Sequence, residues 1–210
     1  MIIKVKNIYA LPATIAPTTF LVTFFAAAEL TPEYSHLSDT VSSIAIQGQP
    51  YALIARAGFI AYGILVIPLG FALFNIYKTH QRILVAKLFF LLFCLYGISD
   101  ALAGIATDDP SWVVTSLGTV HDVAARTGFL AICSAIFLVS LKPGPFPKFT
   151  QAVSLALLIG TLISGALYYL DLNQNLTGLW QRCFFATTLV WVQLASIIVA
   201  FKASRYPCEQ

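Results

Sequence analysis

The stretch "AGFIAYGILVIPLGFALFNIY", residues 57–77, decides the fold class of this chain. It runs for 21 residues without a charged side chain. A helix needs about 20 mostly apolar residues to cross the hydrocarbon layer of a membrane. Residues 57–77 therefore predict a membrane-spanning helix, which we extend back to residue 53 and which has Arg56 in its first turn.

Five further apolar segments resemble this one in length. The 210-residue chain is 59% hydrophobic and only 10% charged, whereas soluble domains carry about 25% charged residues. The segments lack the alternating polarity of barrel strands, and a helix satisfies its own backbone hydrogen bonds in lipid. We therefore predict an all-α membrane protein with a single six-helix transmembrane domain. The predicted spans are 8–29, 53–77, 83–106, 120–141, 149–171 and 181–201.

Basic residues gather at the chain ends and in every second connection between these spans. They are Lys4, Lys6, Lys78, Arg82, Lys87, Lys142, Lys148, Lys202 and Arg205. Six spans place all of them on one side, which the positive-inside rule identifies as cytoplasmic. We expect a multi-pass protein of the cell inner membrane with both termini in the cytoplasm. The net charge of +3 reflects this bias, so we expect membrane lipids as partners and no nucleic acid.

The first predicted span could instead be a secretory signal, because it follows two lysines and ends in "FFAAAE", residues 24–29. Its apolar run of about 21 residues exceeds the 7–15 residues of a signal core. We therefore expect residues 1–28 to be retained. The four cysteines stand singly at 94, 133, 183 and 208, so they predict no disulfide framework and lack the spacing of a cysteine zinc site.

Charged residues at the predicted outer ends of the spans form a regular pattern. The second, fourth and sixth spans each open with an arginine, and these are Arg56, Arg126 and Arg182. The first, third and fifth spans each close with an acid, and these are Glu29, Asp100 and Asp171. The pattern predicts three helical hairpins, each with an acid and an arginine at its outer end. The same order in all three suggests that the acid and the arginine serve the same physical purpose in each. "ARAGF" at 55–59 and "ARTGF" at 125–129 repeat part of the pattern.

Two of these charged residues, Asp100 and Arg126, are predicted to lie within the hydrocarbon layer and not at its outer surface. At 1.5 Å per residue, Arg126 is about 24 Å from Lys142 and Asp100 about 27 Å from Arg82. The hydrocarbon layer is about 30 Å thick, and a charged side chain at its centre costs roughly 2.5–3.5 kcal/mol. Asp100 and Arg126 should therefore face the interior of the bundle or a polar cavity.

The stretch "TVHDVAARTGFLA", residues 119–131, places His121 and Asp122 beside Arg126. Asp122 and Arg126 are four residues apart, so they share a helix face and can pair. One interpretation is a self-contained ion pair at a helix end. The other is that Arg126 joins Arg56 and Arg182 in one outward-facing pocket.

The first outer connection, residues 31–51, contains no Lys or Arg. Apolar residues recur at helical spacing within it, and these are Leu37, Val41, Ile44 and Ala45. This spacing predicts a short amphipathic helix at the membrane interface, capped by Ser35 or Ser38. Such a helix could cover a cavity between the spans. A plain surface turn is the alternative.

Three pieces of the sequence, together with the six spans, resemble a known family. The pieces are "YSHLSDTVS" (34–42), "HDVAARTGF" (121–129) and "GLWQR" (178–182). They resemble the prokaryotic membrane family catalogued as domain of unknown function 998, over about residues 10–202. The resemblance implies a six-helix integral membrane protein with polar positions clustered at the outer ends. It implies no reaction, substrate or catalytic residue.

The leading functional hypothesis is binding or handling of an amphiphilic ligand, such as a lipid, at the outer side. A guanidinium group binds phosphate or carboxylate oxygens in a forked manner, and apolar helices suit acyl or prenyl chains. The candidate ligand-binding residues are Arg56, Arg126, Arg182, Glu29, Asp100, Asp171, His121 and Asp122. Secondary candidates are Ser35, His36, Ser38 and Asp39. We expect no cofactor, and we favour a binding protein over an enzyme.

Three alternatives remain open. A membrane-embedded metal hydrolase could use His36, Asp39, His121 and Asp122, because zinc accepts His and carboxylate ligands, although no H-E-x-x-H motif is present. A haem or quinone carrier would depend on His36 and His121. A structural or regulatory partner of another membrane protein could use the small residues Gly97, Gly104, Gly160, Ser164 and Gly165, although packing within the bundle explains them more simply.

Overall fold

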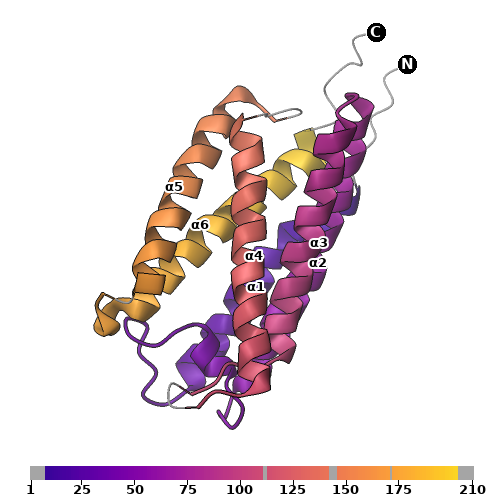
Figure 1. The fold of residues 1–210 in the computed structure, drawn as a ribbon. Coiled ribbons are helices and arrows are strands. Elements are labelled where there is room, and N and C mark those ends of the chain that lie inside the picture. Colours follow the sequence, from indigo (N-terminus) through magenta and orange to yellow (C-terminus); the bar gives the residue numbers. More distant parts are fainter. Residues whose placement is uncertain (1–7, 111–112, 142–145, 171, 203–210) are drawn as a thin grey trace.

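The computed structural model describes residues 8–110, 113–141, 146–170 and 172–202, and these form six long helices (Figure 1). The helices are α1 (Leu11–Leu30), α2 (Ala52–Thr79), α3 (Ile83–Ile105), α4 (Ser116–Leu141), α5 (Lys148–Leu170) and α6 (Thr177–Ile197). Four short elements accompany them: η1 (Ile8–Ala10), η2 (Ser42–Ala45), η3 (Gln174–Leu176) and the π-helical turn η4 (Ile198–Lys202). No strand occurs among these residues, and all six helices are long and apolar enough to cross a membrane. The predicted fold class is confirmed.

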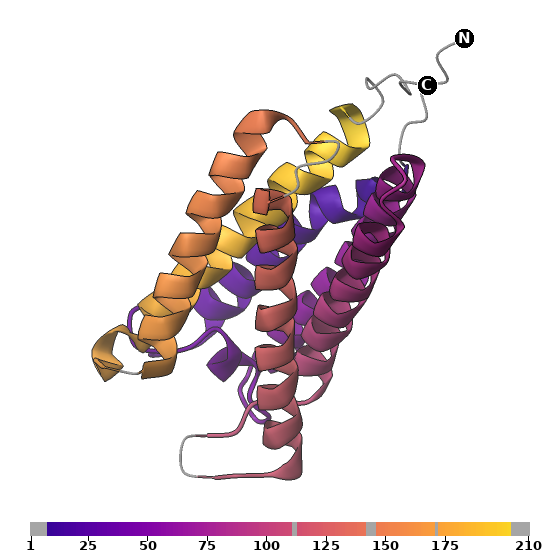
Figure 2. The same cartoon turned by 45° about the horizontal axis from the view of Figure 1, so that its top comes forward.

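The helices form two pairs joined by α4. Helices α2 and α3 pack along each other, as do α5 and α6, and α4 contacts both α3 and α5. Helix α1 packs against α2 and α6. Figures 1 and 2 show α4 between the α2–α3 pair and the α5–α6 pair.

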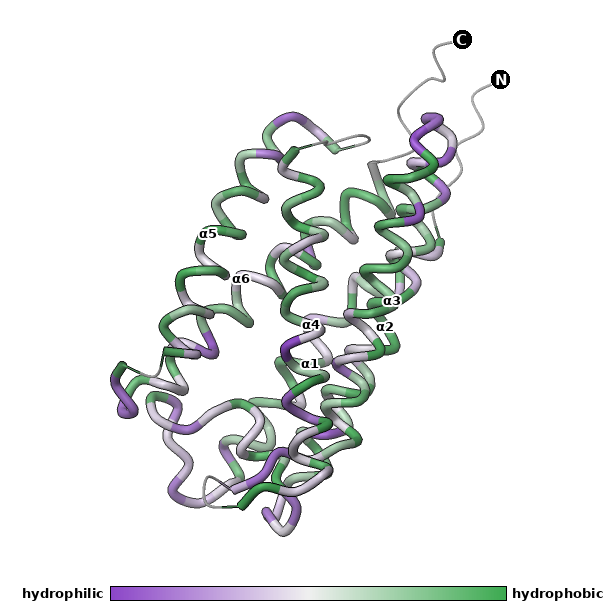
Figure 3. Tube along the Cα trace, in the orientation of Figure 1, coloured by the Kyte–Doolittle hydropathy of each residue, from purple (hydrophilic) through white to green (hydrophobic). Residues whose placement is uncertain are grey.

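Polarity follows the ends of the bundle. Figure 3 shows apolar residues along most of each helix and hydrophilic residues mainly at the helix ends and in the connections. One end carries the turn between α2 and α3, with Lys78 and Arg82, and we call it the basic end. The opposite end carries residues 31–51, and we call it the long-loop end. The assignment of the basic end to the cytoplasm stays a prediction.

Glycines bring α2 and α3 into backbone contact. Gly63 and Gly70 are seven residues apart on α2, and Gly97 and Gly104 are seven apart on α3, so each pair lies on one helix face. A Cβ atom at Gly104 would lie 2.8 Å from the carbonyl oxygen of Arg56, and one at Gly70 would lie 2.5 Å from Cβ of Phe93. Small residues at such positions permit close packing of membrane helices. These glycines therefore serve contacts within the bundle.

Two other small-residue positions also face neighbouring helices. A Cβ atom at Gly160 of α5 would lie 3.2 Å from Cγ2 of Thr187 on α6. One at Gly165 would lie 2.7 Å from Cζ of Phe129 on α4. Packing inside the bundle thus accounts for the four glycines among the small residues that suggested a partner protein.

The first connection, residues 31–51, contains turns and the four-residue η2 where an amphipathic helix was predicted. Side chains bind the backbone here: the Asp39 carboxylate accepts a hydrogen bond from Ser35 N at 2.8 Å, and Thr40 Oγ1 accepts one from Ser43 N at 3.1 Å. Such bonds compete with helix formation. Val41 and Ile44 are nevertheless buried, so the apolar side of the segment packs against the bundle.

Candidate functional site

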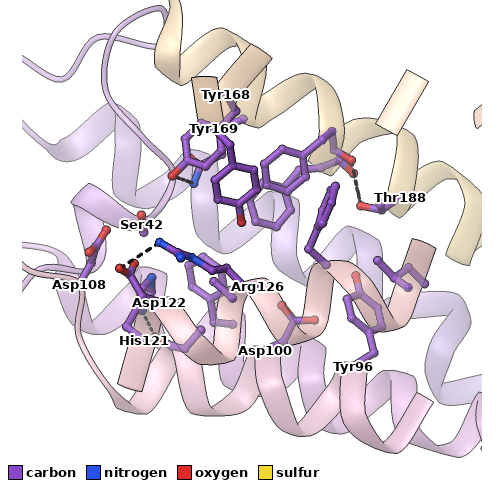
Figure 4. A pocket seen from close by; sticks show the side chains of 18 residues that line it. Ser42, Tyr96, Asp100, Asp108, His121, Asp122, Arg126, Tyr168, Tyr169 and Thr188 are labelled. Carbon is purple, nitrogen blue, oxygen red and sulfur yellow. Dashed lines mark hydrogen bonds and ion pairs between the residues drawn. The ribbon is translucent and has the colours of Figure 1, made fainter. Parts of the chain in front are cut away.

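A cavity of about 80 Å³ lies between α3, α4, α5 and α6, near the long-loop end (Figure 4). Part of its wall is aromatic and comes from three helices, with Phe129, Tyr168, Tyr169, Phe184 and Phe185. Its polar lining includes Asp100, His121, Asp122, Arg126, Gln181 and Thr188. A single water molecule needs about 10–15 Å³ on this scale, so the cavity has room for several. We call it the α4 cavity, because α4 contributes both members of its ion pair, Asp122 and Arg126.

Asp122 and Arg126 form an ion pair at the edge of the α4 cavity. Arg126 Nη2 lies 3.7 Å from Asp122 Oδ2, and the two side chains are 64% and 60% exposed, respectively. The Arg126 guanidinium also lies 6.0 Å from the centre of the Tyr169 ring. An exposed pair of this kind contributes about 0–1 kcal/mol to stability. The guanidinium is therefore loosely held and can exchange Asp122 for another anion.

Asp100 lies one turn after Tyr96 on α3 and projects into the same cavity as Arg126 (Figure 4). Its Oδ2 atom is buried and has no hydrogen-bond partner among the residues that the structure describes. The neighbouring Tyr96 hydroxyl instead hydrogen-bonds the Tyr62 hydroxyl at 2.8 Å. Burial of a carboxyl group without a partner is unfavourable. Asp100 is therefore the polar group of the cavity with the greatest need of a partner.

His121 joins α4 to the end of α3. Its Nδ1 atom lies 2.9 Å from the carbonyl oxygens of both Ala103 and Ala106. Carbonyl oxygens only accept hydrogen bonds, so Nδ1 carries the proton. The ring is buried against the end of α3 while it lines the cavity, so it fixes the position of Asp122 and Arg126 relative to α3.

Arg56 binds the end of α3 and does not line the α4 cavity. Its Nε donates to the carbonyl oxygen of Gly104, and its Nη2 donates to that of Ile105, each at 2.9 Å. The last carbonyl groups of a helix have no partner within the helix, and a cation there interacts favourably with the helix dipole. Arg56 thus acts as a C-terminal cap of α3, contributed by α2.

Arg182 holds the first connection against α6. Its Nη1 donates to the carbonyl oxygens of Asp39 and Gly178, each at 2.7 Å, and its Nη2 donates to the Tyr34 hydroxyl. The guanidinium also lies 5.3 Å from the centre of the Phe24 ring. Burial raises the pKa of the Tyr34 hydroxyl to about 12, although Arg182 acts in the opposite direction. The hydroxyl is therefore neutral at physiological pH and donates to the carbonyl oxygen of Thr40 at 2.9 Å.

The backbone of the first connection also caps the start of α6. Gly178 N donates to the carbonyl oxygen of Ser38 at 3.2 Å, and Leu179 N donates to that of Leu37 at 2.9 Å. The first amide groups of a helix have no partner within the helix. Gln181 contributes a further bond, because its Oε1 accepts from Val41 N. We call this contact between residues 34–42 and 178–182 the loop dock.

The three sequence pieces that suggested a family therefore have structural roles. Residues 34–42 and 178–182 form the loop dock, and residues 121–129 form one wall of the α4 cavity. The sequence model of one family, described as Protein of unknown function (DUF998), matches residues 14–198. The chain belongs to this DUF998 family. No curated protein and no solved structure matches it.

The three arginines of this DUF998 protein do not meet in one cavity. Arg126 lines the α4 cavity, whereas Arg56 and Arg182 bind backbone carbonyl groups outside its lining. The expectation of a shared pocket for the three guanidinium groups therefore differs from the structure. Helix ends and a loop supply partners for two of them, and spacing along the sequence does not reveal such partners.

The other predicted site residues divide between the cavity and the loop. Asp100, His121 and Asp122 line the cavity. Glu29 lies outside its lining, with Oε1 3.6 Å from His36 Nε2. Ser35 Oγ accepts bonds of 3.4 Å from the backbone amides of Leu37 and Ser38 within the first connection. Asp171 falls outside the described residues.

The histidines and acids do not assemble into a metal-ligand set within the described part of the chain. No three His, Cys, Asp or Glu side chains lie close enough together there to hold a metal ion. His36 lies beside Glu29 and the rings of Phe24 and Tyr34, whereas the Nδ1 atom of His121 binds α3 carbonyl groups. Cys94, Cys133 and Cys183 are free thiols. No contact in this region favours the hydrolase alternative.

Several polar residues of the DUF998 cavity have no distinctive pattern in the sequence. Ser42, Asp108, Gln181 and Thr188 come from three separate segments: the first connection, the connection after α3, and α6. Ser42 and Gln181 belong to the sequence pieces that resemble the family, and that resemblance is the one signal that marked them. Their convergence depends on how the first connection folds over α6.

Proposed function

We propose that this DUF998 protein binds an amphiphilic ligand, with the polar group of the ligand in the α4 cavity and its apolar part along the helices. One observation carries the proposal: an unpartnered Asp100 and a loosely held Arg126 share one cavity within an apolar bundle. Placing an ionisable group inside a membrane domain costs free energy, and such groups generally mark functional positions. We place the protein in the cell inner membrane with both termini cytoplasmic, which puts the cavity in the outer half.

The size of the cavity limits which part of a ligand it can hold. Sites that enclose a whole drug-sized ligand measure about 300–1,000 Å³, whereas the α4 cavity measures about 80 Å³. It therefore suits a compact polar group. Apolar side chains such as Val123 and Leu130 are exposed on α4 near its charged residues, and they offer a surface for the chain of the ligand. This division of polar and apolar surface supports an amphiphile over a wholly soluble ligand.

Filling the cavity tests this proposal. Ala125 lines the cavity and is itself exposed, so Ala125→Trp would place an indole there with little disturbance of the core. Native mass spectrometry of the purified protein should show about a tenfold loss of bound amphiphile, as expected when about 1.4 kcal/mol of binding free energy is lost. Ala156→Trp is the matched control, because Ala156 is exposed on α5 and does not line the cavity. Equal amounts of bound amphiphile in the two variants would contradict the proposal.

A further inference from the structure

The α4 cavity has more acidic than basic side chains. Three carboxyl groups line it, from Asp100, Asp108 and Asp122, whereas Arg126 is the one Lys or Arg side chain among the described lining residues. Arg126 already lies beside Asp122. The Nδ1–H of His121 is directed at carbonyl oxygens of α3. The excess of carboxyl groups over basic groups in the cavity therefore favours a ligand that brings a positive group.

The position of Asp100 indicates where that positive group would bind. Its Oδ2 atom is buried in the cavity wall and has no hydrogen-bond partner within the described residues. Tyr96, Phe129 and Phe184 also line the cavity, on α3, α4 and α6. The faces of aromatic rings attract cations, and ammonium groups are recognised by such rings together with carboxylates. Pairing with a cation lowers the cost of burying a carboxylate.

We propose that the α4 cavity recognises an amine or ammonium group, which the Asp100 carboxyl group binds. This inference rests on the proposed function and names the polar group of the amphiphile. An ammonium group has several donors and is compact enough for a cavity of about 80 Å³. Arg126 remains available for an anionic group of the same ligand, so a zwitterionic head group satisfies both side chains.

Binding of matched amphiphiles to the full-length protein tests this assignment. The probes are decylamine and decyl phosphate, which have the same chain and opposite charge, titrated into protein in nanodiscs while the thermal unfolding midpoint is followed. The wild-type protein should bind decylamine about tenfold more tightly than decyl phosphate, because a hydrogen bond to a charged group contributes about 1.5–3 kcal/mol. This preference requires no variant, so it stands even if a substitution impairs folding. Tighter binding of decyl phosphate would overturn the inference.

Substitution of Asp100 then tests whether this residue binds the amine. Asp100→Asn keeps the shape of the side chain and removes its charge, so it should weaken decylamine binding about tenfold and leave decyl phosphate binding unchanged. Glu29→Gln is the control, because Glu29 is an acid at the same end of the bundle that does not line the cavity. Decylamine binding that is equal in Asp100→Asn and Glu29→Gln would contradict a role for Asp100.

The outcomes of these experiments also distinguish a failure of this inference from a failure of the proposed function. If both amphiphiles bind and Ala125→Trp weakens both, without a preference for decylamine, the amphiphile proposal stands and the amine inference fails. If butylamine binds as tightly as decylamine and depends on Asp100, the amine inference stands and the amphiphile proposal fails. If no probe responds to Ala125→Trp, both fail.

Discussion

Gly97→Leu is expected to prevent α2 and α3 from packing and to lower the free energy of unfolding by about 3 kcal/mol or more. A Cβ atom at Gly97 would lie 2.5 Å from Cγ1 of Ile67 and would also meet the carbonyl oxygen of Gly63. A backbone atom cannot move aside as the end of a side chain can, so the two helices must separate. Unfolding by sodium dodecyl sulfate, followed by circular dichroism, measures the change.

Gly160→Leu is the matched control for this prediction. A Cβ atom at Gly160 would have one neighbour within 4 Å, a methyl group of Thr187 at 3.2 Å. That methyl group belongs to a side chain and can shift, so the loss of stability should be smaller, about 1 kcal/mol. If Gly97→Leu were no more damaging than Gly160→Leu, the close packing of α2 against α3 would be wrong.

Arg182→Gln is expected to release the loop dock and to lower the free energy of unfolding by about 1.5–3 kcal/mol, the range for hydrogen bonds made by a charged group. The substitution removes the bonds of the guanidinium to Asp39, Gly178 and Tyr34 together. Residues 31–51 should then become accessible to protease. Chymotrypsin suits the measurement, because the segment contains Tyr34, Leu37 and Tyr51 but no Lys or Arg.

Two variants control for the loss of a positive charge. Arg182→Lys keeps the charge but cannot bind three oxygens in a planar fork, so its cleavage rate should lie between wild type and Arg182→Gln. Arg82→Gln removes a charge at the basic end, so cleavage in residues 31–51 should stay at the wild-type rate. A rate in Arg182→Gln equal to that in Arg82→Gln would refute the loop dock.

The six spans could be predicted from the sequence because hydropathy alone determines which segments can cross a membrane. The first residues of the helices were harder to predict, because hydrogen bonds from neighbouring polar groups extend a helix beyond its apolar segment. Helix α4 begins at Ser116, where residue 120 was predicted, because Thr115 Oγ1 accepts a bond of 3.0 Å from Gly118 N and Asp109 in turn binds Thr115. Helix α6 begins at Thr177, where residue 181 was predicted, because the first connection caps its first turn.

Depth and spacing located part of the candidate site. The depth of Asp100 and Arg126 along their helices predicted that each faces the bundle interior or a polar cavity, and both line the α4 cavity. Asp122 pairs with Arg126, as one interpretation of the four-residue spacing predicted. Arg56 and Arg182 could not be placed in this way. Long arginine side chains reach backbone oxygens on other segments, and those contacts depend on helix packing that the sequence pattern does not contain.

Photo-crosslinking at the cavity tests the central claim, that the α4 cavity holds one class of amphiphile, most directly. The photo-crosslinker p-benzoylphenylalanine would replace Tyr169, which lines the cavity, or Leu170, an exposed neighbour on α5 that does not line it. Mass spectrometry then identifies the molecules captured in the native membrane. We predict that position 169 captures one amine-bearing class of amphiphile, enriched over the bulk lipid mixture captured at position 170. The same lipid mixture at both positions would contradict the account.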